Sequence, residues 1–365
     1  MKLTLFSLLI LSLGALGACS DDVGTGPGGE LSVDPGRCLT APEFEQLKVG
    51  DGSLAVSGVA VSCTHVAWLA PIETESGLSE AQVQVHDITG GFSYRTTAPA
   101  EVDEEPATRW SPALHGFWLA YAEENRVVVE NLRDYERAEF EAKPSVGKVV
   151  DVHYPWVVWQ QDGDFGRTVV YAGHLEDGMT VQVTPSDATA THISVDSGRV
   201  VYTLWPEDLD GPLPTLDGSA QVQVFNLGVD EVGMAVHPTD AMTMAGSVYG
   251  DTVAYLLKEE GETYVVARSL TSGVEIGAVT GGIPDDAWPQ SGASVITWFK
   301  YASPTQTYVA WWPHLGHIDE LPFGSNASMF DVGEHLLVSD AGDDAALNVE
   351  LLYPRETSEA PEGSE

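Results

Sequence analysis

Six short segments of this chain repeat one pattern, in which two aliphatic or β-branched residues precede an aromatic residue. They are Val66-Ala67-Trp68, Leu119-Ala120-Tyr121, Val157-Val158-Trp159, Val200-Val201-Tyr202, Val253-Ala254-Tyr255 and Ile296-Thr297-Trp298, and Leu336-Leu337-Val338 is a weaker seventh. The segments recur about every 45 residues, which is the length of one four-stranded propeller blade.

Each triplet is followed by further short strand-like segments separated by turn signals. Examples are VVVENL (127–132) and YVVARSL (264–270), and a third kind of segment follows, such as TVQVTP (180–185). No stretch has a sustained helical period of apolar residues, so we expect few helices. The pattern predicts an all-β propeller with seven four-stranded blades, with six or eight blades as alternatives. An array of β-sandwiches would be expected to show linkers between domains, and the rungs of a β-helix are shorter.

The seventh repeat has no outer strand. Only the Glu-, Ser- and Pro-rich segment 354–365 follows LNVELLY (347–353), and we expect this segment to be a disordered acidic tail. Before the first blade, EFEQLKVG (43–50) belongs to no repeat. We therefore expect the propeller to span 36–353 and its ring to be closed by this N-terminal strand, which would remove two open sheet edges.

Two segments carry a resemblance to a known family. The stretch SVDSGRVVY (194–202) and the stretch SLTSG (269–273) resemble the repeats of TolB-like and related WD40-like propellers, in which small residues and glycine form the turns. The resemblance implies a propeller over residues 50–353. TolB-like propellers have six blades and an additional N-terminal domain, and this chain shows neither.

The N-terminus has the layout of a bacterial lipoprotein signal. Lys2 precedes a short apolar run, and Leu16-Gly17-Ala18-Cys19 resembles a lipobox. We expect cleavage after residue 18 and lipid on Cys19, followed by a flexible tether over 19–35. This predicts attachment to a membrane of the cell envelope, with the outer membrane or cell surface favoured because Ser20 follows the cysteine.

Composition sets limits on partners. The formal net charge is −39, which disfavours binding to nucleic acid and favours basic proteins or cations. Of three cysteines, Cys38 and Cys63 remain once Cys19 is lipidated, and outside the cytoplasm we expect them to form a disulfide.

The loops expected between the second and third strands of each blade, the first of which is 69–82, are rich in acids. The longest, 203–220, holds Trp205 and Leu213 among acidic side chains, and an exposed aromatic residue surrounded by charge is typical of a contact element. Packing of Trp205 against the fourth blade is the alternative. The candidate binding residues are Trp205, Glu207, Asp208, Asp210 and Asp217. Asp162, Asp164, Asp208 and Asp210 lie on glycine-containing loops and are candidate calcium ligands, so calcium is the one candidate cofactor.

Catalytic signatures are missing from the sequence. It contains no Gly-x-Ser-x-Gly elbow, no His-Glu-x-x-His and no phosphate loop. The leading hypothesis is a monomeric, envelope-anchored binding or assembly propeller that contacts a protein or polymer through an acidic loop face. The alternatives are a glycosidase-like hydrolase acting on a polymer, using two acids at the channel mouth, and a purely structural envelope component.

Overall fold

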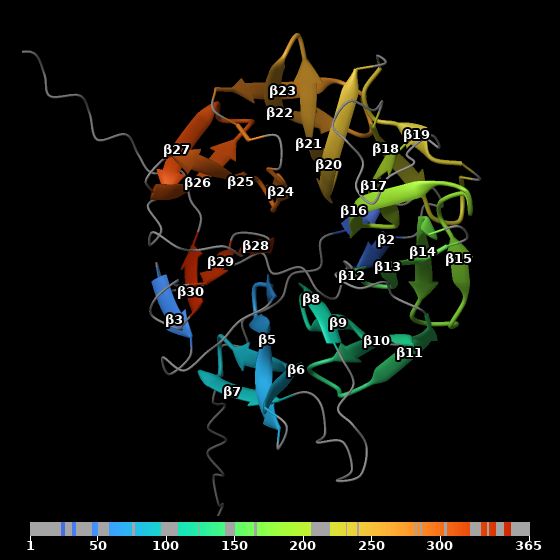
Figure 1. The fold of residues 1–365 in the computed structure, drawn as a ribbon, viewed down its shortest axis with the longest axis vertical. Coiled ribbons are helices and arrows are strands. Elements are labelled where there is room, and N and C mark those ends of the chain that lie inside the picture. Colours follow the sequence, from blue (N-terminus) through green and yellow to red (C-terminus); the bar gives the residue numbers. More distant parts are fainter. Residues whose placement is uncertain are drawn as a thin grey trace, which may run out of the picture.

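The computed structural model describes residues 23–25, 31–33, 46–49, 58–74, 77–95, 109–123, 125–142, 150–163, 166–205, 220–230, 232–238, 241–281, 283–284, 287–302, 305–321, 330–333, 336–340 and 347–351. Within these ranges the fold is all-β. Four-stranded antiparallel sheets are arranged around a central axis as a β-propeller (Figure 1). Among the same residues no helix is long and apolar enough to cross a bilayer.

Six blades are each built from four consecutive strands, ordered from the central axis outward. The first three are blade 1 with β4 (Val59–Val61), β5 (His65–Thr74), β6 (Gly77–Asp87) and β7 (Phe92–Arg95); blade 2 with β8 (Arg109–His115), β9 (Trp118–Glu123), β10 (Arg126–Asn131) and β11 (Arg137–Glu141); and blade 3 with β12 (Val150–His153), β13 (Trp156–Asp162), β14 (Thr168–His174) and β15 (Thr180–Gln182).

The next three follow the same order. They are blade 4 with β16 (Thr189–Asp196), β17 (Arg199–Trp205), β18 (Gln221–Asn226) and β19 (Met234–Ala235); blade 5 with β20 (Met242–Tyr249), β21 (Thr252–Glu259), β22 (Glu262–Ser269) and β23 (Glu275–Thr280); and blade 6 with β24 (Gln290–Ser291), β25 (Ile296–Ala302), β26 (Thr305–Trp312) and β27 (His317–Leu321).

The last four-stranded sheet is a composite. It contains β28 (Phe330–Gly333), β29 (Leu336–Asp340) and β30 (Leu347–Leu351), and β3 (Gln46–Val49) pairs with β30 as its outer strand. The prediction of seven blades is therefore corrected. The chain supplies six self-contained blades, and the seventh sheet, called blade 7 below, is assembled from segments some 300 residues apart, roughly the length of a whole propeller.

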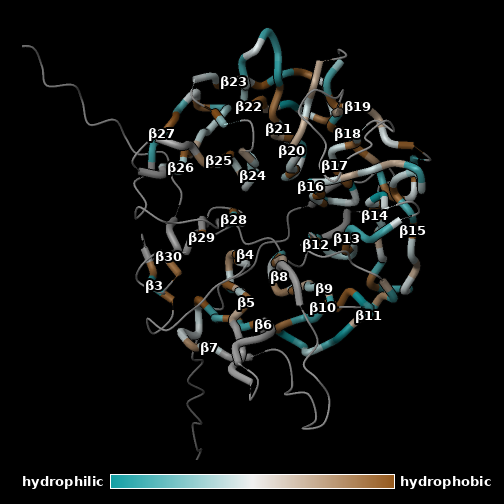
Figure 2. Tube along the Cα trace, viewed as in Figure 1, coloured by the Kyte–Doolittle hydropathy of each residue, from teal (hydrophilic) through white to brown (hydrophobic). Residues whose placement is uncertain are grey.

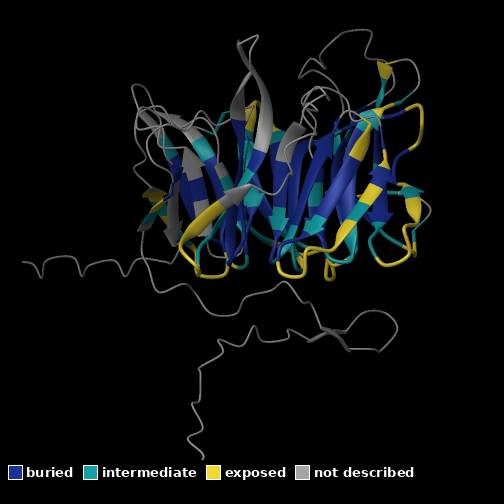
Figure 3. Ribbon diagram, turned by 90° about the horizontal axis from the view of Figure 1, so that it is seen from below, coloured by how far each residue is buried: buried dark blue, intermediate teal, exposed yellow. Residues whose placement is uncertain are grey.

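The repeated triplets lie in the second strand of each blade, between the innermost strand and the third strand. Their aromatic residues are almost fully buried: Trp68, Tyr121, Trp159, Tyr202, Tyr255 and Trp298. The core clusters join residues of neighbouring sheets, as where Ala120 and Val129 of blade 2 pack with Val157 of blade 3. Figure 3 shows this buried layer running through the disc, and Figure 2 shows hydrophilic residues mainly at turns and outer strands.

The two faces of the disc are defined by the connections. Turns between strands one and two and between strands three and four lie on one face, here called the turn face. Connections between strands two and three, and between blades, lie on the opposite face, here called the loop face. Segment 69–82, expected as a loop, is instead mostly the extended β5–β6 hairpin, with Thr74 paired to Gly77.

Two observations concern the N-terminal part of the chain. A two-stranded sheet of β1 (Val23–Thr25) and β2 (Leu31–Val33) occurs within the expected tether. Cys63, in the β4–β5 turn, is buried and disulfide-bonded. Cys38 lies outside the described residues, so its pairing with Cys63 stays a prediction, as does lipidation of Cys19, which also lies outside them.

Candidate functional site

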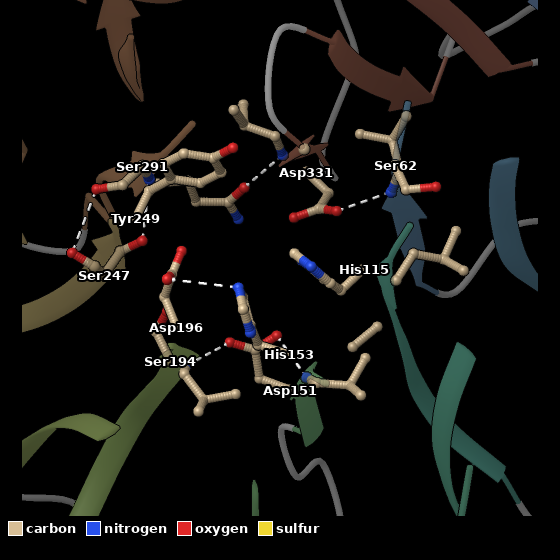
Figure 4. A pocket seen from close by; sticks show the side chains of 18 of the residues that line it. Ser62, His115, Asp151, His153, Ser194, Asp196, Ser247, Tyr249, Ser291 and Asp331 are labelled. Atoms are coloured by element: carbon tan, nitrogen blue, oxygen red, sulfur yellow. Dashed lines mark hydrogen bonds and ion pairs between the residues drawn. The ribbon is translucent and has the colours of Figure 1, made fainter. Parts of the chain in front are cut away.

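The innermost strands of all seven sheets line a central cavity of about 390 Å³. Its wall contains residues of β4, β8, β12, β16, β20, β24 and β28. Figure 4 shows that many of these side chains are polar and point into the channel from different blades. This convergence makes the channel the candidate site in the described part of the molecule.

One position of the innermost strand recurs in every sheet. It is the residue that pairs with the middle of the buried triplet, or with its counterpart Val338 in blade 7, and it is occupied by Ala60, Ala113, Asp151, Ser194, Ser247, Gln290 and Asp331. Five of the seven are polar, although they sit on strands next to the core.

The five polar side chains share one role, because each accepts a hydrogen bond from the backbone of the next blade. The donors are Val195 N–H to Asp151 Oδ2 (2.7 Å), Val248 N–H to Ser194 Oγ (3.2 Å), Ser291 N–H to Ser247 Oγ (2.9 Å), Val332 N–H to Gln290 Oε1 (3.0 Å) and Val61 N–H to Asp331 Oδ2 (2.8 Å). These bonds satisfy inward-facing amides of strands that have no further strand to pair with. We call this set the polar ring.

Alanine replaces the acceptor in blades 1 and 2, and other contacts join these blades to the next. Ser62 Oγ donates to the Gly116 carbonyl at 2.8 Å, linking blade 1 to blade 2. The imidazoles of His115 and His153 lie with ring centroids 3.9 Å apart, linking blade 2 to blade 3. Every neighbouring pair of blades is therefore connected through the channel wall.

The end of the channel nearest the turn face is polar on one side. His153 Nε2 lies 3.5 Å from Asp196 Oδ1, and both side chains are buried. Asp196 also accepts hydrogen bonds from Gly250 N–H (2.9 Å) and Ser197 Oγ (2.6 Å). This end can hydrogen-bond a small polar molecule or water through side chains of blades 1 to 5.

Two carboxyl groups in the ring have strongly perturbed acidity. Burial raises the pKa of Asp151 to about 7, against the lowering effect of the N–H groups of Val195 and Val152, and the negative charge of Asp331 raises it further. Burial likewise raises the pKa of Asp331 to about 6. Both carboxyl side chains are partly buried, and both line the channel. The protein that surrounds them disfavours their charged form.

The hydrogen bonds described above limit the chemistry of the site. The channel carboxyls already accept backbone N–H groups and so have a structural role. Among the described residues no group of three or more His, Cys, Asp or Glu side chains is placed to hold a metal ion. The hydrogen bonds of the polar ring hold neighbouring blades together, and other polar side chains of the wall can hydrogen-bond small polar molecules.

Of the sequence-predicted binding residues, the structure describes only Trp205. Trp205 ends β17 and is buried, and its indole N–H donates to Thr191 Oγ1 at 2.8 Å. The interpretation of Trp205 as an exposed contact residue is wrong, because this hydrogen bond and the packing of blade 4 hold the ring inside. Glu207, Asp208, Asp210 and Asp217 lie outside the described residues.

Of the four predicted calcium ligands, the structure describes only Asp162. Asp162 is exposed at the end of β13. Asp164, Asp208 and Asp210 lie outside the described residues, so the calcium site stays a prediction.

Sequence reasoning missed the channel carboxylates Asp151, Asp196 and Asp331. A signal was present, because Asp151, Ser194, Ser247 and Gln290 each precede the middle of the following triplet by seven residues. Polar residues at a fixed offset from a buried repeat indicate a shared position in each blade.

Comparisons with known proteins support the fold. No protein-family profile matches this sequence, and no curated protein has significant similarity to it. The β-propeller domain of the Trilobed protease from Pyrococcus furiosus is similar, with a TM-score of 0.56 and 11% identity, over 81% of this chain and 90% of that chain.

Two other solved structures are comparably similar. The acylaminoacyl peptidase of Pyrococcus horikoshii gives a TM-score of 0.54 at 10% identity, over 80% of this chain but only 49% of that chain. The β-propeller domain of Cps50 (Swd1) from Myceliophteria thermophila gives 0.53 at 9% identity, over 84% of this chain and 99% of that chain. At these identities the likeness shows the β-propeller fold alone.

Proposed function

We propose that this chain is a binding propeller, held at a membrane by lipid on Cys19, that contacts a cationic protein or polymer through its loop face. The observation that carries the proposal is an exposed acidic hairpin on that face. Glu259, Glu260 and Glu262 are all exposed at the β21–β22 turn. The net charge of −39 extends the same preference to the whole chain.

The route of the chain supports an orientation in which the turn face is nearer to the membrane anchor than the loop face. In the seventh sheet β3 is antiparallel to β30, with Gln46 opposite Glu350 and Val49 opposite Leu347. The third strand of a blade runs from the loop face to the turn face, so β3 begins at the turn face. An anchor at Cys19 would therefore be connected to the turn face and leave the loop face available to partners.

A binding role agrees better with the channel than a hydrolytic one. A glycosidase-like site needs one carboxyl free to protonate a leaving group and a second free to act as base or nucleophile. Asp151 accepts N–H groups at both carboxyl oxygens, from Val152 (2.8 Å) and Val195 (2.7 Å). Asp331 is held by Val61 N–H.

The anchor is tested by Cys19→Ser in the producing bacterium. We expect the variant to leave the membrane fraction or to remain uncleaved, because a hydroxyl cannot carry the thioether-linked lipid. Fractionation and the mass of the mature N-terminus measure this. Normal cleavage together with unchanged membrane association would contradict the lipid anchor.

The acidic hairpin is tested by Glu259→Gln with Glu260→Gln, using a decalysine peptide as probe. We expect the apparent Kd for the peptide to rise several-fold and its salt dependence to weaken, because exposed charges act over roughly 8 Å at physiological salt. The matched control is Asp134→Asn with Glu136→Gln, two exposed acids in the β10–β11 turn on the other face. If both pairs lower binding equally, total charge rather than the loop face attracts the cation, and the chain is better described as a structural component.

A further inference from the structure

Exposed large apolar side chains of the described residues concentrate at one kind of turn. All nine lie in the connection between the third and fourth strand of a blade or at the start of the fourth strand. We select one of these exposed apolar residues from each of blades 1 to 6 and call the set the apolar rim. Its members are Phe92, Tyr135, Met179, Val229, Val274 and Leu315.

The exposure of these residues is large. The exposed fraction is 81% for Tyr135, 68% for Val229 and 64% for Leu315. Single exposed apolar residues are normal on a protein surface. Exposed apolar side chains, however, recur at the same turn in six successive blades of a chain with a net charge of −39. This recurrence indicates an apolar contact surface.

The apolar rim lies on the turn face. Each third strand pairs antiparallel with its neighbours and ends at this face, as β14 does at His174 before Met179 and β26 does at Trp312 before Leu315. The exposed turns along the lower edge of the disc in Figure 3 show the same side. Cys63 and the start of β3 at Gln46 are on this face too.

We propose that the apolar rim rests on the lipid surface to which the chain is anchored, an inference that depends on the proposed lipid on Cys19. About 27 residues separate Cys19 from Gln46; an unstructured chain of that length would span roughly 30 Å on average, and the β1–β2 pairing shortens this reach. The anchor therefore keeps the turn face, rather than the loop face, close to the bilayer.

The charges beside the rim select the kind of lipid. Exposed acids, among them Asp134, Glu136 and Asp177, lie in the same turns as Tyr135 and Met179. Anionic headgroups would repel them, so the surface is expected to be zwitterionic. Tyrosine, with an apolar ring and a polar hydroxyl, is a side chain typical of the membrane–water interface.

The experiment uses the full-length lipidated protein in phosphatidylcholine vesicles that contain a lipid with a quencher on its upper acyl chain. A fluorophore is attached to Leu315→Cys or, in a second sample, to Met179→Cys, and the matched control carries it at Glu260→Cys on the loop face. We expect quenching at both rim positions to exceed that at the control at least threefold, and substituting serine at Tyr135, Val229 and Val274 to reduce it. Equal quenching at both faces, or stronger quenching at position 260, would overturn the proposal.

The proposed lipid on Cys19 and the proposed membrane contact of the apolar rim can be tested independently. The same labelled chains made with Cys19→Ser are added to preformed vesicles at saturating lipid. Selective quenching at Leu315→Cys in this sample supports the rim even where fractionation shows that Cys19 carries no lipid. Absence of selective quenching in both samples overturns the rim whatever the state of Cys19.

Discussion

Replacing Val49 with aspartate should destabilise the propeller on the order of 3–5 kcal/mol, the largest effect expected from a single substitution here. Val49 is 1% exposed and is the last residue of β3. It packs in one cluster with Val61, Trp68 and Leu347. An aspartate there would bury a carboxylate without a partner and would remove apolar contacts that join the N-terminal strand to blades 1 and 7.

The expected signature is a lower melting temperature together with aggregation, because β30 would lose its outer partner and expose a free sheet edge. Lys48→Ala is the matched control, since this exposed neighbour on β3 contributes little apolar packing. Urea unfolding of the two variants measures the difference. A Val49→Asp protein that unfolds at the parent's midpoint would show that β3 does not hold the seventh sheet together.

The buried strands could be predicted because their sequence pattern and their burial have the same cause. The second strand of every blade is covered on both faces by neighbouring sheets, so it needs a continuous apolar run such as Val157-Val158-Trp159. The location of the closing strand near residues 43–50 could also be inferred, because the last repeat ended before its outer strand.

Other features left no such pattern. The end of the β5–β6 hairpin, around Pro71 and Glu73, is rich in polar residues and was interpreted as a loop, yet it forms a paired ribbon with a register shift. The position of Trp205 depends on Thr191, fourteen residues earlier in the chain, and an aromatic residue beside acids is compatible with either exposure or burial.

The innermost strands were the hardest elements to recognise, and they form the candidate site. β12 has four residues and β24 has two, too short for a period to be counted. Their polar residues resemble loop residues in the sequence. The seven-residue offset from the triplets marks a shared position, but the role of these residues follows from the closed ring, because the inward edge of each sheet needs acceptors from the adjacent blade.

The paired substitution Asp151→Asn with Asp331→Asn should make the propeller more stable than the parent at pH 8 and about equal to it at pH 5. Burial raises the pKa of Asp151 to about 7 and that of Asp331 to about 6, from ordinary values near 3.8. Between pH 4 and 7 the folded protein therefore holds protons that the unfolded chain has released. By linkage, the free energy of unfolding falls as pH rises through this window.

The size of the effect follows from the shifts. One pKa unit corresponds to about 1.4 kcal/mol, so the parent should lose on the order of a few kcal/mol between pH 5 and 8 through these two groups. Asparagine carries no proton to lose, and its amide oxygen can still accept the N–H of Val195 or Val61. The variant should therefore lose less stability across the same range.

Two histidines with a large decrease in pKa act in the opposite direction and must be separated from this effect, and His86 and His237 act in the same sense as these two. Burial lowers the pKa of both His65 and His192 to about 4. The unfolded chain binds protons at these residues below pH 6.5 and the folded protein does not, so their contribution raises stability as pH rises from 4 to 6.5. Because all four histidines are present in parent and variant, the difference between the two unfolding curves isolates the aspartates.

Two further variants separate charge from hydrogen bonding. Asp162→Asn should change the unfolding free energy little, because this carboxylate is exposed at the end of β13. Asp151→Ala should lose about 1–3 kcal/mol at pH 5, because the N–H of Val195 would remain buried without an acceptor, and less at pH 8, where the substitution also removes the buried charge. Parallel pH curves for the parent and the double asparagine variant would contradict the raised pKa values. A stable Asp151→Ala protein would instead show that the polar ring does not hold neighbouring blades together, so the two measurements distinguish the acidity of the channel from its structural role.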